Sequence, residues 1–155
     1  MTARFYQTGV AVALIMTATA CGGGGGSTPA PTPVTVKSAV VTATMTIESA
    51  KVGTANHYTA HVTVRESGGL GVTLGNGTFT FFVGTAAYAT LNVTGGEAWV
   101  NITLPASTSL ESNPMTAIDE DPTQVPDSVQ FVLSYVDFNQ KAGTATATAS
   151  VPVPK

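Results

Sequence analysis

Acidic side chains gather in one polar segment of the chain. Five of the nine Asp and Glu residues fall between positions 111 and 127, and they are Glu111, Asp119, Glu120, Asp121 and Asp127. In an extended backbone, Asp119 and Asp121 point the same way and lie about 6.6 Å apart. Carboxylate oxygens at that spacing can share a calcium ion, with Asp127 as a further candidate ligand. The spacing fits no named calcium motif, so a solvated acidic loop is the competing interpretation.

Trp99 is the candidate residue for recognising a sugar. Alternation over residues 98–104 predicts a strand in which Trp99, Asn101 and Thr103 share the outward face. An exposed indole ring beside polar groups can stack on a glycan. The commoner role of such an aromatic side chain is to pack on a partly covered sheet face.

The sequence predicts no catalytic site. His57 and His61 fall on one face of a predicted strand, about 13 Å apart, so they cannot bind one metal ion together. The sequence holds no Gly-x-Ser-x-Gly elbow, phosphate-binding loop or zinc-type spacing. Six Lys and Arg stand against nine Asp and Glu without a basic cluster, so we expect no nucleic-acid partner and no charge-driven binding to anionic lipid. We expect a non-enzymatic protein with no cofactor beyond the calcium considered above.

Cys21 is the only cysteine of the chain. Before it, Arg4 is followed by a short apolar run over residues 9–16 and by small residues at 17–20, which is the layout of a secretory signal peptide. The apolar run is too short for a transmembrane helix. After Cys21 come five glycines and a Pro-rich stretch, a composition typical of a linker that reaches at most about 40 Å.

Residues Ala18-Thr19-Ala20-Cys21 resemble the lipobox of bacterial lipoproteins. In that family the cysteine thiol is acylated, the leader is cleaved before the cysteine, and the new amino terminus is acylated too. The resemblance implies that Cys21 is the lipid attachment site, carrying palmitate or a similar chain. It also implies a lipid-anchored protein of the cell envelope, at the outer membrane or cell surface because Gly22 is not Asp. Ala18 replaces the usual large aliphatic residue, so a soluble secreted or periplasmic product is the alternative.

Residues 34–155 are predicted to form one β-rich domain. Period-two alternation recurs, for example over residues 57–65 and 129–135, and turn signals follow about every ten residues without a helical pattern. Gly75-Asn76-Gly77 is predicted as a tight turn, and residues 105–127 as one long polar loop. Hydrophobic residues make up 43% of the chain and charged residues only 10%, which favours an ordered, hydroxyl-rich β protein.

These patterns predict an all-β fold, an antiparallel Greek-key β-sandwich of seven or eight strands, with an open barrel as the alternative. By strand number, length and final hairpin, the body resembles bacterial immunoglobulin-like and fibronectin-III-like domains. We expect a signal peptide at 1–20, a lipid anchor and flexible linker at 21–33, and the sandwich at 34–155, with the leader and linker disordered.

The resulting functional hypothesis is a cell-envelope lipoprotein whose immunoglobulin-like module serves a structural or interaction role. Its expected partners are the membrane, through the lipid anchor, and an envelope protein or a glycan. A glycan- or calcium-binding module is the alternative of a different class.

Overall fold

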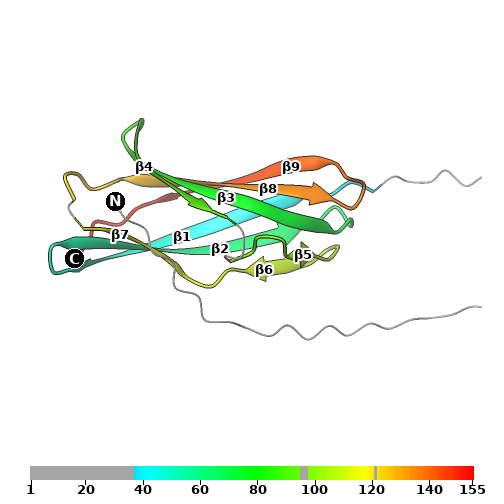
Figure 1. Cartoon of the computed structure of the whole chain (residues 1–155), viewed down its shortest axis with the longest axis horizontal. Coiled ribbons are helices and arrows are strands. Elements are labelled where there is room, and N and C mark those ends of the chain that lie inside the picture. Colours follow the sequence, from blue (N-terminus) through cyan, green and yellow to red (C-terminus); the bar gives the residue numbers. More distant parts are fainter. Residues whose placement is uncertain (1–36, 95–97, 121) are drawn as a thin grey trace, which may run out of the picture.

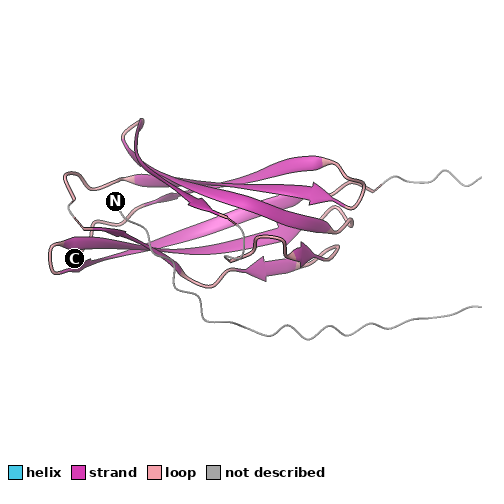
Figure 2. Ribbon diagram, viewed as in Figure 1, coloured by secondary structure: helices cyan, strands magenta, loops and turns pink. Residues whose placement is uncertain are grey.

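The computed structural model describes residues 37–94, 98–120 and 122–155. These residues contain nine strands and no helix. Figure 2 shows the described chain as strands and connecting loops. The strands are β1 (Val41–Val52), β2 (Ala55–Glu66), β3 (Val72–Val83), β4 (Ala86–Val93), β5 (Thr103–Leu104), β6 (Ser109–Glu111), β7 (Met115–Asp119), β8 (Ser128–Asp137) and β9 (Ala142–Ser150). The described part of the chain has no helix suited in length and apolarity to span a membrane.

The strands form two antiparallel sheets that pack face to face (Figure 1). In sheet A, β2 lies between β1 on one side and β6 and β7 on the other. Sheet B has the order β4-β3-β8-β9, and β5 also pairs with β3. The chain leaves sheet A after β2, returns to it for β6 and β7, and finishes in sheet B. This is the Greek-key connection of an immunoglobulin-like sandwich. The predicted fold class is therefore confirmed over the open barrel, with nine strands among the described residues in place of the predicted seven or eight.

β2, the central strand of sheet A, shows strict alternation of buried and more exposed residues. Its even-numbered residues, from Asn56 to Glu66, are buried, while its odd-numbered residues are more exposed. The aromatic centre of the core lies opposite, where the Phe79 and Phe131 rings stack with centroids 4.7 Å apart and Trp99 meets Phe131 edge-on at 5.1 Å. Such ring pairs add to the free energy gained by burying their apolar area.

The predicted tight turn at Gly75-Asn76-Gly77 is wrong. β3 runs through this stretch, and its register against β8 shifts between Leu74 and Gly77, which marks a β-bulge. Glycine is required at position 77 because a Cβ there would lie 2.6 Å from Cζ2 of Trp99 and 2.8 Å from Cε2 of Phe131. The glycine therefore admits the two aromatic rings into the core.

The predicted long polar loop over residues 105–127 contains two strands. β6 pairs with residues 63–65 of β2, and β7 pairs with residues 56–60. Together they complete the edge of sheet A, and Met115, Ala117 and Asp119 of β7 are buried. The acidic segment is thus partly core.

The sandwich has two ends with different contents. We call the end where the described chain begins the near end; there Asn139 of the β8–β9 turn donates its side-chain N–H to the carbonyl of Lys37 at 3.2 Å. At the opposite, far end, Lys51 N donates to Lys155 O at 3.0 Å. Because Val41 pairs with Glu66 and Val52 with Ala55, β1 runs the length between them. The near end is on the right in Figure 1 and the far end on the left.

Candidate functional site

Trp99 lies inside the sandwich rather than on its surface. Residues 98–101 form a turn, not the predicted strand, and only Thr103 and Leu104 of that stretch are extended. The Trp99 side chain is 1% exposed and fills the space above Gly77. A ring enclosed in this way cannot stack on a sugar, so the prediction of an outward-facing ligand site at Trp99 is wrong.

The candidate calcium ligands serve different elements of the fold. Asp119, on β7, is buried and accepts a hydrogen bond from the Tyr88 hydroxyl at 2.7 Å. This bond, with burial adding to it, raises the pKa of Tyr88. Asp127 is exposed and accepts from the backbone N–H of Gly84 at 2.6 Å, closing the β3–β4 turn. Asp121 lies outside the described residues, and those that are described contain no group of three or more His, Cys, Asp or Glu placed to hold a metal ion.

A polar groove of about 220 Å³ lies at the far end, beside Asp119. Asn56, the register partner of Asp119, contributes to it from β2 and Lys51 from β1. Tyr58, two residues along β2 from Asn56, is buried, and its hydroxyl has no hydrogen-bond partner among the described residues. Burial raises the pKa of Tyr58, and the Asn56 side chain acts in the opposite direction. The groove is lined by Lys51, Asn56, Pro122, Thr123, Gln124, Val125, Val153 and Pro154.

A second groove, of about 520 Å³, opens on sheet B beside the β-bulge. It crosses β3, β8 and β9, and the turn at Asn101 closes one side. The lining carries no charged residue. Its residues are Thr73, Leu74, Gly75, Asn101, Ser134, Tyr135, Val136, Ala142, Gly143 and Thr144.

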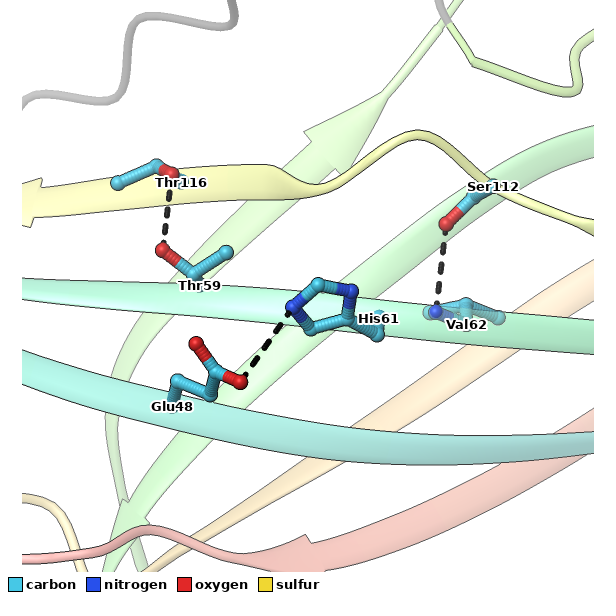
Figure 3. Close-up of polar contacts among 6 residues, drawn as sticks. All are labelled: Glu48, Thr59, His61, Val62, Ser112 and Thr116. Carbon is cyan, nitrogen blue, oxygen red and sulfur yellow. Dashed lines mark hydrogen bonds and ion pairs between the residues drawn. The ribbon is translucent and has the colours of Figure 1, made fainter.

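Both histidines lie on the more exposed face of β2, as the sequence predicts. His61 approaches Glu48 of β1, with Nε2 and Oε1 3.9 Å apart, and the Thr59 and Thr116 hydroxyls bond at 3.0 Å (Figure 3). Further along, the Ser112 hydroxyl accepts from Val62 N at 3.3 Å. These contacts join β1, β2 and the β6–β7 segment across the face of sheet A. An exposed ion pair of this kind contributes little to stability.

Glu66 occupies a carboxylate cage that sequence reasoning missed. It is 0% exposed, and its two oxygens accept hydrogen bonds from four backbone N–H groups. Burial opposes ionisation of the carboxyl, but the four donors outweigh it, so the pKa of Glu66 is lowered. The donors are Val40 (3.2 Å), Gly68 (2.6 Å), Gly69 (3.2 Å) and Ser107 (2.7 Å).

The cage joins three segments of the near end. Val40 belongs to the incoming chain, Gly68 and Gly69 to the β2–β3 loop, and Ser107 to the β5–β6 loop. Asp137 has a similar role in the β8–β9 turn, where its Oδ1 accepts from Asn139 N at 2.9 Å and Lys141 N at 2.8 Å. The buried acids at this end therefore organise loops. The one sequence signal for Glu66 is the Gly-Gly pair that follows it closely.

Comparison with known proteins adds no function. No family model and no curated protein matches the sequence. Among solved structures, the chain is similar to the Northeast Structural Genomics Consortium target SoR45, with 13% identity, 74% of this chain and 87% of that chain covered, and a TM-score of 0.47. It is also similar to a CARDB domain from Pyrococcus furiosus solved in complex with di-metal ions, with 19% identity, 74% and 89% coverage, and a TM-score of 0.32. The chain is an immunoglobulin-like β-sandwich module on the strength of its own two sheets.

Proposed function

We propose that this chain is a lipid-anchored protein of the cell envelope that presents its sandwich as a structural or interaction module. The observation that carries the proposal is the sequence around Cys21. The chain's only cysteine follows a signal-peptide-like leader directly and precedes a Gly- and Pro-rich stretch.

The position of Lys37 supports the same proposal. The described chain begins at one end of the sandwich, and the linker therefore joins the module at its near end. An anchor at Cys21 leaves the outer faces of both sheets and the far end open to partners.

We further propose that the module is not an enzyme. The buried acids are engaged in the structure: Glu66 and Asp137 hold loops, and Asp119 holds Tyr88. His61 faces outward towards Glu48 on the surface of sheet A. None of these contacts places a nucleophile beside a base.

Acylation at Cys21 is tested by expressing the full chain in a bacterium that processes lipoproteins. Radiolabelled palmitate is expected in the wild-type protein and absent from Cys21→Ser, and mass spectrometry is expected to find acyl chains on a peptide that begins at Cys21. Ala18→Leu supplies the large aliphatic residue usual in a lipobox and is expected to be acylated at least as completely as wild type. Label that persists in Cys21→Ser, or an unmodified N-terminal cysteine, would contradict the anchor and identify a soluble secreted protein.

A further inference from the structure

We propose that the near end of the sandwich is a membrane-docking surface. Phe138 and the apolar residues around it enter the lipid interface, and Lys37 and Lys141 meet anionic headgroups. The inference rests on the proposed lipid anchor and goes beyond it, because it assigns the module an orientation on the membrane. The docking surface consists of Lys37, Val40, Ile102, Val136, Phe138 and Lys141.

The near end carries the larger share of the exposed large apolar side chains. Four of the seven exposed large hydrophobic side chains of the described residues lie at the near end, with exposed fractions of 49% for Val40, 38% for Ile102, 40% for Val136 and 55% for Phe138. Exposed apolar groups gathered on one face mark an interaction surface. Phe138 is the only aromatic residue among the seven.

The Phe138 ring is held in place rather than left free. Its backbone N–H donates to Gly71 O at 3.1 Å, and its ring packs against Gly71 so closely that a Cβ there would lie 2.7 Å from Cε2. The glycine therefore seats the ring while more than half of the side chain stays in solvent. A fixed aromatic tip loses little conformational entropy when it enters an interface.

The charges at this end are arranged for an anionic surface. Lys141 lies in the same turn as Phe138, and the backbone of Lys37 is bonded to that turn through Asn139. The acids that hold these loops, Glu66 and Asp137, are 0% and 4% exposed and turn their oxygens to backbone N–H groups, and the exposed Glu111 lies farther along sheet A, opposite Thr63. A headgroup approaching these loops therefore meets the two ammonium groups. The sequence shows no basic cluster because the two lysines are brought together only by the fold.

The far end offers a different surface. Its exposed charged side chains include the acids Glu120 and Asp127 together with Lys51 and Lys155, so the acids there offset the lysines and weaken the attraction to an anionic membrane. Its exposed valines, Val52, Val125 and Val153, bring no aromatic ring. The docking surface is thus specific to the end at which the linker enters.

The linker makes weak docking sufficient. Residues 21–36 join the sandwich at the docking surface itself, so an anchored chain keeps that surface within about 50 Å of the bilayer. Confinement of this kind replaces a bimolecular association by an intramolecular one with an effective concentration near the millimolar range. A single aromatic tip and two lysines, too weak to recruit a free protein, then suffice to hold a tethered one.

The test uses a chain of residues 21–155 coupled through Cys21 to maleimide lipid in vesicles. The vesicles contain phosphatidylglycerol and phosphatidylcholine with brominated acyl chains, which quench tryptophan on contact. Phe138→Trp places a reporter at the docking surface, and Val153→Trp places an equally exposed reporter at the far end. The buried Trp99 gives the same background in both. We expect Phe138→Trp emission to be quenched at least about twofold more than that of Val153→Trp.

The charge contribution is measured with Lys37→Glu and Lys141→Glu in the Phe138→Trp background. The equilibrium for docking on phosphatidylglycerol vesicles is expected to fall about fivefold or more with each change. On vesicles of phosphatidylcholine alone the variants and their parent are expected to be alike. Lys155→Glu, at the far end, is the matched control and leaves docking unchanged.

Equal quenching of the two tryptophan reporters would overturn the proposal. So would quenching that disappears when each vesicle carries fewer than one chain, because the near end would then be contacting a second copy rather than lipid. The chemical coupling works whether or not the cell acylates Cys21. A failed palmitate experiment with positive quenching would therefore reject the natural anchor alone, and the reverse result would reject the docking surface alone.

Discussion

Glu66 shows how one side chain can hold the near end together. Four backbone N–H groups from three separate segments converge on its carboxylate. The carboxylate is a buried negative charge, and oriented backbone amide dipoles stabilise it instead of a cation. A buried carboxylate of this kind makes the stability of the fold dependent on pH.

The first prediction concerns the pH dependence due to Glu66. Because its pKa in the fold is below its ordinary value of 4.5, the stabilisation is complete above pH 4.5 and is lost as the pH falls through the lowered pKa. In Glu66→Gln this acid-dependent loss is expected to disappear from urea-unfolding curves. At pH 7 the variant is expected to be less stable by about 2–3 kcal/mol. The glutamine N–H₂ group replaces an oxygen that accepted hydrogen bonds from backbone N–H groups, and those N–H groups are left without an acceptor.

Glu48→Gln is the matched control for that experiment. Glu48 is an exposed carboxyl on β1 that lies 3.9 Å from His61, so its replacement is expected to change stability by less than about 0.5 kcal/mol. If both variants kept the same acid dependence as wild type, the assignment to Glu66 would be refuted.

The second prediction couples Gly77 to Trp99. A methyl group at position 77 would collide with the Trp99 and Phe131 rings, so Gly77→Ala is expected to cost about 1–3 kcal/mol in chemical denaturation. In a Trp99→Phe background the smaller ring leaves room for the methyl, and the cost is expected to fall. The buried Trp99 N–H finds no acceptor among the described residues, so removing it costs no hydrogen bond there. Strictly additive free energies in the double-mutant cycle would argue against this contact.

At the scale of elements, β6 and β7 are the part of the fold that the sequence analysis did not recognise. They are short, separated by Pro114, and embedded among acids and prolines that are typical of loops. Their strand character comes from β2, which offers them a free edge with buried partners at Tyr58 and Ala60. Short edge strands of this kind are decided by tertiary pairing rather than local propensity.

The third prediction tests whether residues 115–119 are core. Met115 is 8% exposed, and its removal in Met115→Ala is expected to cost about 2–4 kcal/mol of unfolding free energy. Val125 lies in the same acidic segment but is 42% exposed, so Val125→Ala is expected to be nearly neutral. If Met115→Ala is as stable as Val125→Ala, residues 115–119 are not part of the core, and the solvated loop predicted from the sequence is correct.

The sequence predicts elements whose pattern is set by burial on one face better than elements that depend on tertiary contacts. Strands with strict alternation, such as β2 and β8, were predicted correctly because their period is set by burial on one face. Trp99 was misplaced because its alternation continues through a turn, and only the space above Gly77 explains its position. The Glu66 cage and the pairing of Lys37 with the β8–β9 turn join residues far apart in sequence, so no local pattern encodes them.

At the scale of the whole molecule, the two ends divide the functions that we propose. The near end follows directly on the linker, carries Phe138 and buries Glu66 and Asp137. The far end carries the polar groove with Lys51 and the exposed Glu120 and Asp127. If the anchor and docking proposals hold, the far end points away from the lipid and is the surface available to a partner.

The β1–β2 ladder gives this arrangement a mechanical consequence. Its twelve register pairs run from the near end to the far end. For the anchored chain that we propose, tension between the linker and a partner bound at the far end would act along this direction. A pulling force along that direction acts on β1 in shear, so the hydrogen bonds of the ladder resist it together instead of opening one after another. Glu66 and Ser67 fasten the first residues of that path, through Val40, to the neighbouring loop. The proposed anchored module would therefore resist tension applied between its two ends.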